Sequence, residues 1–217
     1  MERLPVLYKK RFEGELSFRM AMWKTLCESF FQRYVSAGTC VIDVGAGYCE
    51  FINNIKCGRK IAVDCNEDTK KFASSGVEVI SADATDMKAI ADETGDIVFV
   101  SHLFEHLARE DILKTMTEMR RILKPDGRLL VLQPNIRYCY RDYWMFLDHI
   151  TPLDDRSIGE ALTMTGFEVV ECRRKFLPYT TKSKLKNFVF LLNAYLKMPL
   201  AQYIFGQQAF IVAKKEK

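Results

Sequence analysis

The sequence predicts a doubly wound α/β fold, in which helices cover both faces of a mostly parallel sheet. Short runs rich in Val, Ile and Leu recur along the chain and are continuous rather than alternating, as expected for parallel strands buried on both faces. Helical patterns alternate with these runs, and this rhythm is typical of open α/β sheets. The predicted strands are residues 39–43, 60–64, 77–81, 96–101 and 128–133, with two further candidates at 167–174 and 208–213.

Two helices follow from the spacing of their apolar residues. The first covers residues 15–36, and the second covers roughly residues 109–123. The Lys-Pro-Asp-Gly sequence at 124–127 ends the second helix and turns the chain into the next strand. Two segments lie outside this alternation. They are a polar, aromatic insertion at 134–154 and a segment containing an apolar helix at 175–206.

The composition is that of one ordinary globular domain. The chain has 217 residues, of which 48% are hydrophobic and 28% are charged. Lys and Arg number 32 and Asp and Glu number 28, which gives a net charge of +4. These values exclude a fibre, a disulfide scaffold and an integral membrane protein. The charge is also too small for a dedicated nucleic-acid binder, so we expect no nucleic-acid partner.

The seven cysteines are scattered, and no two have the CxxC spacing. An odd, scattered set indicates reduced and packed thiols, and therefore a cytoplasmic protein. The first residues lack the apolar core of a signal peptide, and no apolar run reaches the roughly 18 residues of a membrane span. Because no cluster of Cys and His has ligand spacing, the sequence predicts no metal site.

The loop after the first predicted strand is the first candidate binding site, because open α/β sheets bind ligands at the carboxyl ends of their strands. It reads Asp43-Val-Gly45-Ala46-Gly47, and its glycines allow a sharp turn and a close approach to a ligand. The following helix presents its N-terminal N–H groups to the same place. Asp64 ends the second predicted strand, where its two carboxylate oxygens can accept hydrogen bonds from both hydroxyls of a ribose.

Two cofactors carry such a ribose, a nicotinamide dinucleotide and S-adenosylmethionine. The dinucleotide fingerprint GxGxxG places its third glycine at position 50, where this chain has Glu50. A carboxylate there would repel a pyrophosphate, whereas S-adenosylmethionine has no phosphate. Asp43 also suits a ligand with an ammonium group. Asp83, after the third strand, can accept a hydrogen bond from an adenine amino group or, like Asp86, cap a helix over 86–91.

These residues resemble the class I S-adenosylmethionine-dependent methyltransferases over about residues 39–133. VIDVGAGYCEF is similar to the first motif of that family, with Cys49 where a third glycine is common. DIVFVSHLFEHL and LKPDGRLLVLQPN resemble the motifs of strands four and five. The resemblance implies a Rossmann-like methyltransferase fold with seven strands, of which the last, here 208–213, is antiparallel.

The resemblance also implies S-adenosylmethionine as cofactor and S-adenosylhomocysteine as its product. The chain would be a single domain over 1–217, with a helical extension at 1–38, a cofactor-binding half at 39–133 and an acceptor-side half at 134–217. The resemblance places Asp43 near the amino group of the cofactor and Gly45, Ala46 and Gly47 at its methionine moiety. Asp64 would bind the ribose, with Cys65 beside it, and Asp83 and Ala84 would lie at the adenine. Ser101, His102 and Leu103 would lie beneath the sulfonium.

Methyl transfer to a hydroxyl requires a base, and His suits that task at neutral pH. His149, in the insertion after strand five, is the first candidate, and His106 is the second. Alternatively, His149 only packs within its loop, and His106 only caps the turn after strand four. Asn135, Tyr143 and Trp144 are candidates for binding the acceptor, although the aromatic residues can equally cover the sheet edge. The bacterial methyltransferases that the chain resembles are often associated with glycan or lipid-linked sugar biosynthesis, so we expect such a small-molecule or glycan-type acceptor, methylated at oxygen.

Several alternatives stay open. The segment 183–198 is basic at its front and apolar behind, which fits a helix at a membrane surface, a helix over the sheet or a homodimer interface. A nucleic-acid methyltransferase is an alternative function, although residues 101–104 lack the N/D-P-P-Y/F motif for base amines. A nicotinamide-dependent oxidoreductase is opposed by Glu50. A further alternative is a module that binds the cofactor without catalysis, and only a measurement of turnover distinguishes it from an enzyme.

Overall fold

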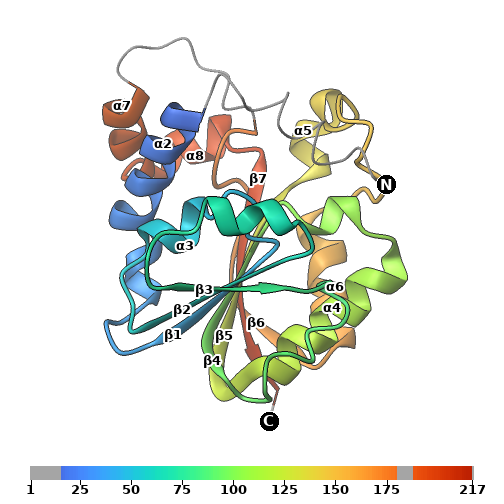
Figure 1. Cartoon of the computed structure of the whole chain (residues 1–217). Coiled ribbons are helices and arrows are strands. Elements are labelled where there is room, and N and C mark those ends of the chain that lie inside the picture. The colour runs from blue at the N-terminus through green and yellow to red at the C-terminus, as the bar shows by residue number, and fades with distance from the viewer. Residues whose placement is uncertain (1–15, 180–187, 217) are drawn as a thin grey trace.

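Seven strands form one sheet in the computed structural model, which describes residues 16–179 and 188–216 (Figure 1). The strands are β1 (Cys40–Val44), β2 (Arg59–Asp64), β3 (Val77–Ser81), β4 (Gly95–Ser101), β5 (Leu123–Pro134), β6 (Phe167–Arg173) and β7 (Gln208–Lys215). Their order is β3-β2-β1-β4-β5-β7-β6, and β7 is antiparallel to both of its neighbours. The predicted fold class is confirmed. Since the strand order reverses between β1 and β4, the binding crevice is expected at the carboxyl ends of these two strands.

Helices cover both faces of the sheet (Figure 1). One face carries α2 (Leu16–Ser29), α3 (Glu50–Asn54) and α7 (Phe188–Leu196), and the other carries α4 (Arg109–Ile122) and α6 (Asp155–Met164). Neighbouring residues of β1 enter different cores, since Val41 packs on the first face and Ile42 on the second. Both side chains are wholly buried, which explains why the strand is continuously apolar.

The predicted helix over 15–36 is too long. α2 ends before that boundary, and a 3₁₀ turn, η1 (Phe31–Tyr34), follows it. The change of direction carries the ring of Phe30 into the core, where its centroid lies 4.1 Å from that of Phe176. Aromatic packing against the far end of the sheet therefore ends the regular helix earlier than the apolar spacing indicated.

Two local features between β3 and β5 differ in detail from the expectations. Residues 82–94 form turns rather than a helix over 86–91. α4 ends at Ile122, just before the Lys-Pro-Asp-Gly sequence. Residues 124–127 lie within the bounds of β5 as an irregularity, because the pairing with β4 passes from Gly95 with Leu123 to Ile97 with Arg128. The remaining helical segments are η2 (Glu67–Lys71), η3 (Phe104–His106), α5 (Ile136–Tyr143) and α8 (Pro199–Phe205).

The apolar helix predicted over 183–198 corresponds in part to α7, and residues 183–187 lie outside the described part of the chain. α7 packs on α2 through the buried side chains of Leu192 and Leu196, in accord with a helix that lies over the sheet. Pro199 begins α8 as a new helix, because a proline has no N–H to continue the previous one. Within 16–179 and 188–216, no helix is long and apolar enough to cross a membrane.

Candidate active site

The loop between β1 and α3 has an unusual backbone conformation. The φ angle is +73° at Gly45, +51° at Gly47 and +57° at Cys49, values that side chains rarely permit. A Cβ atom on Gly45 would lie 3.2 Å from Leu103, so glycine allows this loop to pass close to the end of β4. A Cβ atom on Gly47 would meet nothing within 4 Å, so the loop opens onto free space there. Cys49 holds, with a side chain, the left-handed conformation that a third glycine would adopt.

Asp64 is oriented by the loop that it faces. One of its carboxylate oxygens accepts a hydrogen bond from the Gly47 N–H at 2.7 Å, and the other accepts from the Asn66 N–H at 2.8 Å. Each oxygen has a second lone pair, so both can still accept a bond from a ligand hydroxyl. Cys65 follows and is exposed. The end of β2 and the glycine loop therefore form one polar edge beside free space.

Asp43 lies within β1 and is 3% exposed. Its carboxyl hydrogen-bonds to the backbone of Ile52 in α3. Burial, reinforced by the nearby charge of Asp64, raises the pKa of Asp43 to about 8. The carboxyl therefore holds a proton at neutral pH unless a positive charge lies beside it.

Asp83 and Ala84 follow β3, two strands away from the switch point of the sheet. The Oδ1 atom of Asp83 accepts hydrogen bonds from the N–H and the hydroxyl of Thr85, at 2.8 and 2.7 Å. These bonds stabilise a turn rather than a helix start. The Asp83 side chain remains exposed, and Ala84 is half-buried.

The chain leaves β4 through Ser101, His102 and Leu103. His102 has a φ angle of +51°, and its Nδ1 atom lies 3.1 Å from the Ser101 hydroxyl oxygen. Removal from water lowers the pKa of His102 to about 3, so its ring is neutral at pH 7 and a poor proton acceptor. Leu103 approaches Gly45, and this turn and the glycine loop are therefore adjacent walls of one site.

Three titratable side chains meet next to this turn. Glu105 and His106 belong to η3, and His149 lies in the loop after α5. Their potential ligand atoms all lie within 4.8 Å of one another, and the two imidazole centroids are 5.0 Å apart. This spacing is short enough for proton exchange through small movements, and three such donors can also surround a cation.

Glu105 is a member of this cluster that was not a candidate in the sequence. It is 1% exposed, and burial raises the pKa of its carboxyl. Gln133, at the end of β5, donates a hydrogen bond to it at 2.8 Å. Gln133 was not a candidate in the sequence. It could have been identified, because an amide side chain ends the apolar run of a buried strand at this position.

His106 is oriented by Asp148. Its Nδ1 atom lies 3.0 Å from the Asp148 carbonyl oxygen, so the ring donates from Nδ1, and Nε2 carries the lone pair when the ring is neutral. The Asp148 carboxylate lies 3.5 Å from the same nitrogen. These contacts fix the orientation of the His106 ring. The rings of Tyr143 and Phe146 pack against His149, with centroids 4.8 and 5.2 Å away.

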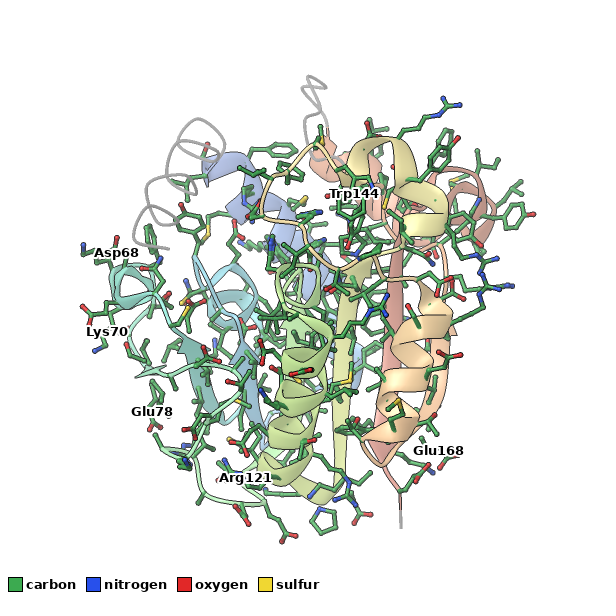
Figure 2. The ribbon with its side chains drawn as sticks, turned by 90° about the vertical axis from the view of Figure 1, so that its right-hand side faces the viewer. Asp68, Lys70, Glu78, Arg121, Trp144 and Glu168 are labelled. Atoms are coloured by element: carbon green, nitrogen blue, oxygen red, sulfur yellow. The ribbon has the colours of Figure 1, made fainter. Side chains whose placement is uncertain are left out.

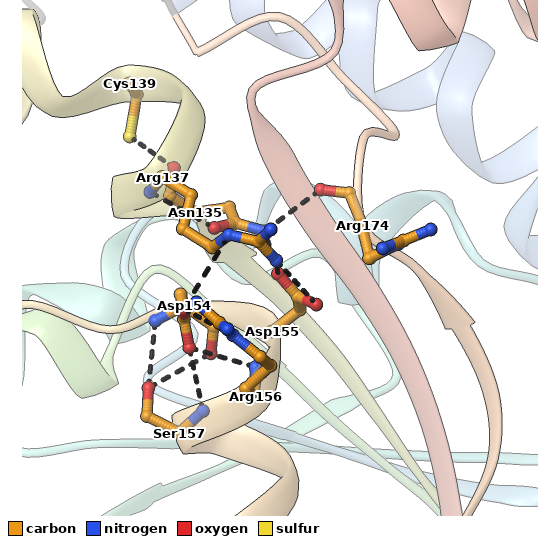
Figure 3. A network of polar contacts seen from close by, with 8 residues as sticks. All are labelled: Asn135, Arg137, Cys139, Asp154, Asp155, Arg156, Ser157 and Arg174. Atoms are coloured by element: carbon orange, nitrogen blue, oxygen red, sulfur yellow. Dashed lines mark hydrogen bonds and ion pairs between the residues drawn. The ribbon is translucent and has the colours of Figure 1, made fainter.

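Asn135 is wholly buried in a polar network (Figure 3). Its side-chain oxygen accepts from the N–H of Arg137 and caps α5. Its amide nitrogen donates to Asp155 at 2.8 Å and to the Arg174 carbonyl at 3.1 Å. These bonds hold the start of the insertion against β6, so the side chain proposed for the acceptor is engaged in positioning the acceptor-side segment.

The two aromatic candidates point in different directions. Tyr143 is buried, and its hydroxyl donates to the Thr151 carbonyl oxygen. Trp144 is 55% exposed and lies at the end of the molecule opposite Arg121 (Figure 2). Trp144 is therefore available to an acceptor from solvent, whereas Tyr143 supports the position of His149.

A comparison with family models agrees with this geometry. Residues 42–131 match the model described as a methyltransferase domain, a range that includes the glycine loop, Asp64, Glu105 and His106. This part of the chain is therefore similar to methyltransferase domains. A probable methyltransferase of Aspergillus luteorubrus is 27% identical over 140 residues, which cover 56% of this chain. The match spans 49% of that curated relative, about half of its length.

Solved structures show the same fold over nearly the whole chain. An S-adenosylmethionine-dependent methyltransferase from Archaeoglobus fulgidus has a TM-score of 0.69 at 24% identity and covers 98% of this chain and 100% of its own. A putative methyltransferase of Haloferax volcanii, solved in complex with the Trm112 methyltransferase activator, has a TM-score of 0.71 at 17% identity. That match covers 96% of this chain and 95% of the other.

The Archaeoglobus fulgidus neighbour depends on S-adenosylmethionine, and the residues of the present site fit that ligand. The free space beside Gly47 admits a ligand, Asp64 offers two oriented acceptors, and Asp43 offers a buried carboxyl. Glu50, however, makes two hydrogen bonds to Arg19, at 2.6 and 2.5 Å, so its charge is neutralised. The family match, rather than a free carboxylate at Glu50, is therefore what opposes the nicotinamide alternative.

Proposed function

We propose that this protein transfers the methyl group of S-adenosylmethionine to an oxygen atom of a small-molecule, glycan or lipid-linked acceptor. The observation that carries the proposal is the cluster of Glu105, His106 and His149, which follows directly on the turn that contacts the glycine loop. A hydroxyl must lose a proton to become methylated, and a proton acceptor beside the methyl donor meets that need.

The bound cofactor supplies a methyl group that is already activated by its sulfonium. The protein then has to align the acceptor and exclude water. In the proposed arrangement Asp64 binds the ribose hydroxyls, Asp43 the amino group and Asp83 with Ala84 the adenine. The glycine loop borders the methionine moiety, and residues 101–103 lie beneath the sulfonium.

His149 is proposed as the general base, with His106 beside it as a positioning residue. As the bond from the acceptor oxygen to the methyl carbon forms and the carbon–sulfur bond breaks, the hydroxyl proton passes to a ring nitrogen of His149. S-adenosylhomocysteine and the methylated acceptor remain. The ring of His149 is 7% exposed and is supported by Tyr143, which favours one orientation of the imidazole. All seven cysteines are free thiols, which supports a cytoplasmic location.

Cofactor binding is expected to release a proton from Asp43 at neutral pH. The pKa of Asp43 is about 8 in the free protein, and an ammonium group beside it would favour the ionised carboxylate. Affinity for S-adenosylhomocysteine should therefore rise as the pH increases from 6 towards 8 and then level off. Calorimetry in buffers of different ionisation enthalpy measures the proton directly. Asp43→Asn should bind without this release, whereas an unchanged proton count in that variant would assign it elsewhere.

The acceptor class is tested by a screen for release of S-adenosylhomocysteine. Sugars, nucleotide sugars, lipids, phenols, amines and RNA form its arms. Turnover with a hydroxyl-bearing sugar, lipid or phenol supports the proposal. Turnover with RNA alone would assign the protein to the nucleic-acid methyltransferases, and turnover with amines alone would contradict transfer to oxygen.

A further inference from the structure

The C-terminal helices present an unusual apolar surface. Among the described side chains of α7 and α8, six large apolar ones are exposed. Their exposed fractions reach 75% at Phe190 and 70% at Leu200 and Tyr203. We call this surface the α7–α8 face, and it consists of Phe190, Leu191, Leu200, Tyr203, Ile204 and Phe205. A group of exposed apolar side chains of this size on neighbouring elements marks an interaction site.

The sequence that contains this face has basic residues and no acidic ones. Residues 172–213 contain seven Lys and Arg and no Asp or Glu, in a chain whose net charge is only +4. Lys197 is exposed between α7 and α8. Lys175 contacts α8 directly, because its ammonium donates to the Tyr203 carbonyl at 2.8 Å and lies 4.9 Å from the Tyr203 ring. Apolar side chains bordered by positive charge match the boundary of an anionic bilayer.

The face lies at the same end of the molecule as the candidate active site (Figure 1). Lys175 also lies 4.6 Å from the ring of Tyr138 in α5, and Gln207 donates to the Tyr138 carbonyl at 3.1 Å. α8 and the acceptor-side insertion are thus linked through Lys175 and through Gln207, which follows α8. Trp144, in the same insertion as His149, is a further exposed aromatic side chain at the end of α5.

We propose that the α7–α8 face docks the protein on an anionic lipid bilayer. α7 and α8 are too short to cross a membrane, so they lie in the plane of the interface with the apolar side chains among the lipids. A second copy of this chain fits the face less well, because a two-fold contact would bring two positive surfaces together. If the proposed methyl transfer holds, a docked enzyme would receive its acceptor from the membrane surface.

Sedimentation of the full chain with vesicles tests this docking. The protein should pellet with vesicles of equal parts phosphatidylcholine and phosphatidylglycerol, and less with phosphatidylcholine alone or at high salt. The double variant Ile204→Ser/Phe205→Ser should lower the vesicle partition coefficient by about tenfold or more, because two exposed side chains no longer enter the lipid. Lys197→Glu should lower it by about fivefold or more. Met164→Ser is the matched control, because Met164 is exposed on α6, outside the face, and this variant should bind like the unchanged protein.

The readout separates docking from catalysis. S-adenosylhomocysteine binding, measured on the same samples, shows that each variant is folded and does not depend on lipid. Equal pelleting with neutral and anionic vesicles, or unchanged pelleting of the double-serine variant, would overturn the proposal. Light scattering that shows a dimer which the double-serine variant dissociates would instead assign the face to a second copy of the chain.

Discussion

Asp64→Ala should reduce the affinity for S-adenosylmethionine and S-adenosylhomocysteine by about two orders of magnitude, because two hydrogen bonds from the ribose to a charged carboxylate are lost. The same change removes the bonds from the N–H groups of Gly47 and Asn66 and releases the glycine loop. Calorimetry of both ligands measures the effect.

The matched control is Asp68→Ala. Asp68 lies nearby in η2, but its carboxylate pairs with Lys71 rather than with the glycine loop. We expect its affinity to equal that of the unchanged protein. An Asp64→Ala variant that melts normally and binds both ligands as tightly as the Asp68 control would show that the ribose lies elsewhere.

His149→Ala should lower the turnover number by about a hundredfold to ten-thousandfold, the usual contribution of a positioned general base. Cofactor affinity should not change, because His149 lies in the acceptor-side insertion and outside the glycine loop. Single-turnover release of S-adenosylhomocysteine, measured against pH with an acceptor from the screen, checks this result. The variant should also lose the limb of the profile on which the rate rises as the base is deprotonated.

Two further measurements distinguish a base from other roles of the same cluster. His106→Asn should reduce turnover less than His149→Ala, since His106 acts by position and is held by Asp148. Extensive treatment with a chelator should leave turnover unchanged, since proton transfer to an imidazole needs no cation. Lost turnover that a divalent ion restores would contradict the base and assign Glu105, His106 and His149 to a metal.

Features that depend on near neighbours in the sequence were predictable. The sheet could be predicted because parallel strands are apolar on both faces, as Val41 and Ile42 illustrate. The loop could be predicted because positive φ angles require glycine at Gly45 and Gly47. Cys49 departs from that rule. Its left-handed conformation was indicated only by the resemblance, in which a glycine is common at this position.

Features that depend on tertiary contacts were not predictable. η3 and the loop after α5 are distant in sequence, and the Ile150 N–H bonds to the Glu105 carbonyl to bring His106 and His149 together. Asn135 was assigned to the acceptor because it follows β5, whereas the partners that engage it come from α6 and the end of β6. The sequence also treated Glu50 as a free carboxylate, because its partner Arg19 lies on a different helix.

Binding of S-adenosylhomocysteine to the purified full chain tests the central claim most directly. Calorimetry should show saturable binding with one site per chain, and a parallel titration with NAD or NADP should give no heat of binding. No binding of S-adenosylhomocysteine at millimolar concentration, or saturable binding of the dinucleotide in its place, would contradict a methyltransferase site between the glycine loop and the end of β4.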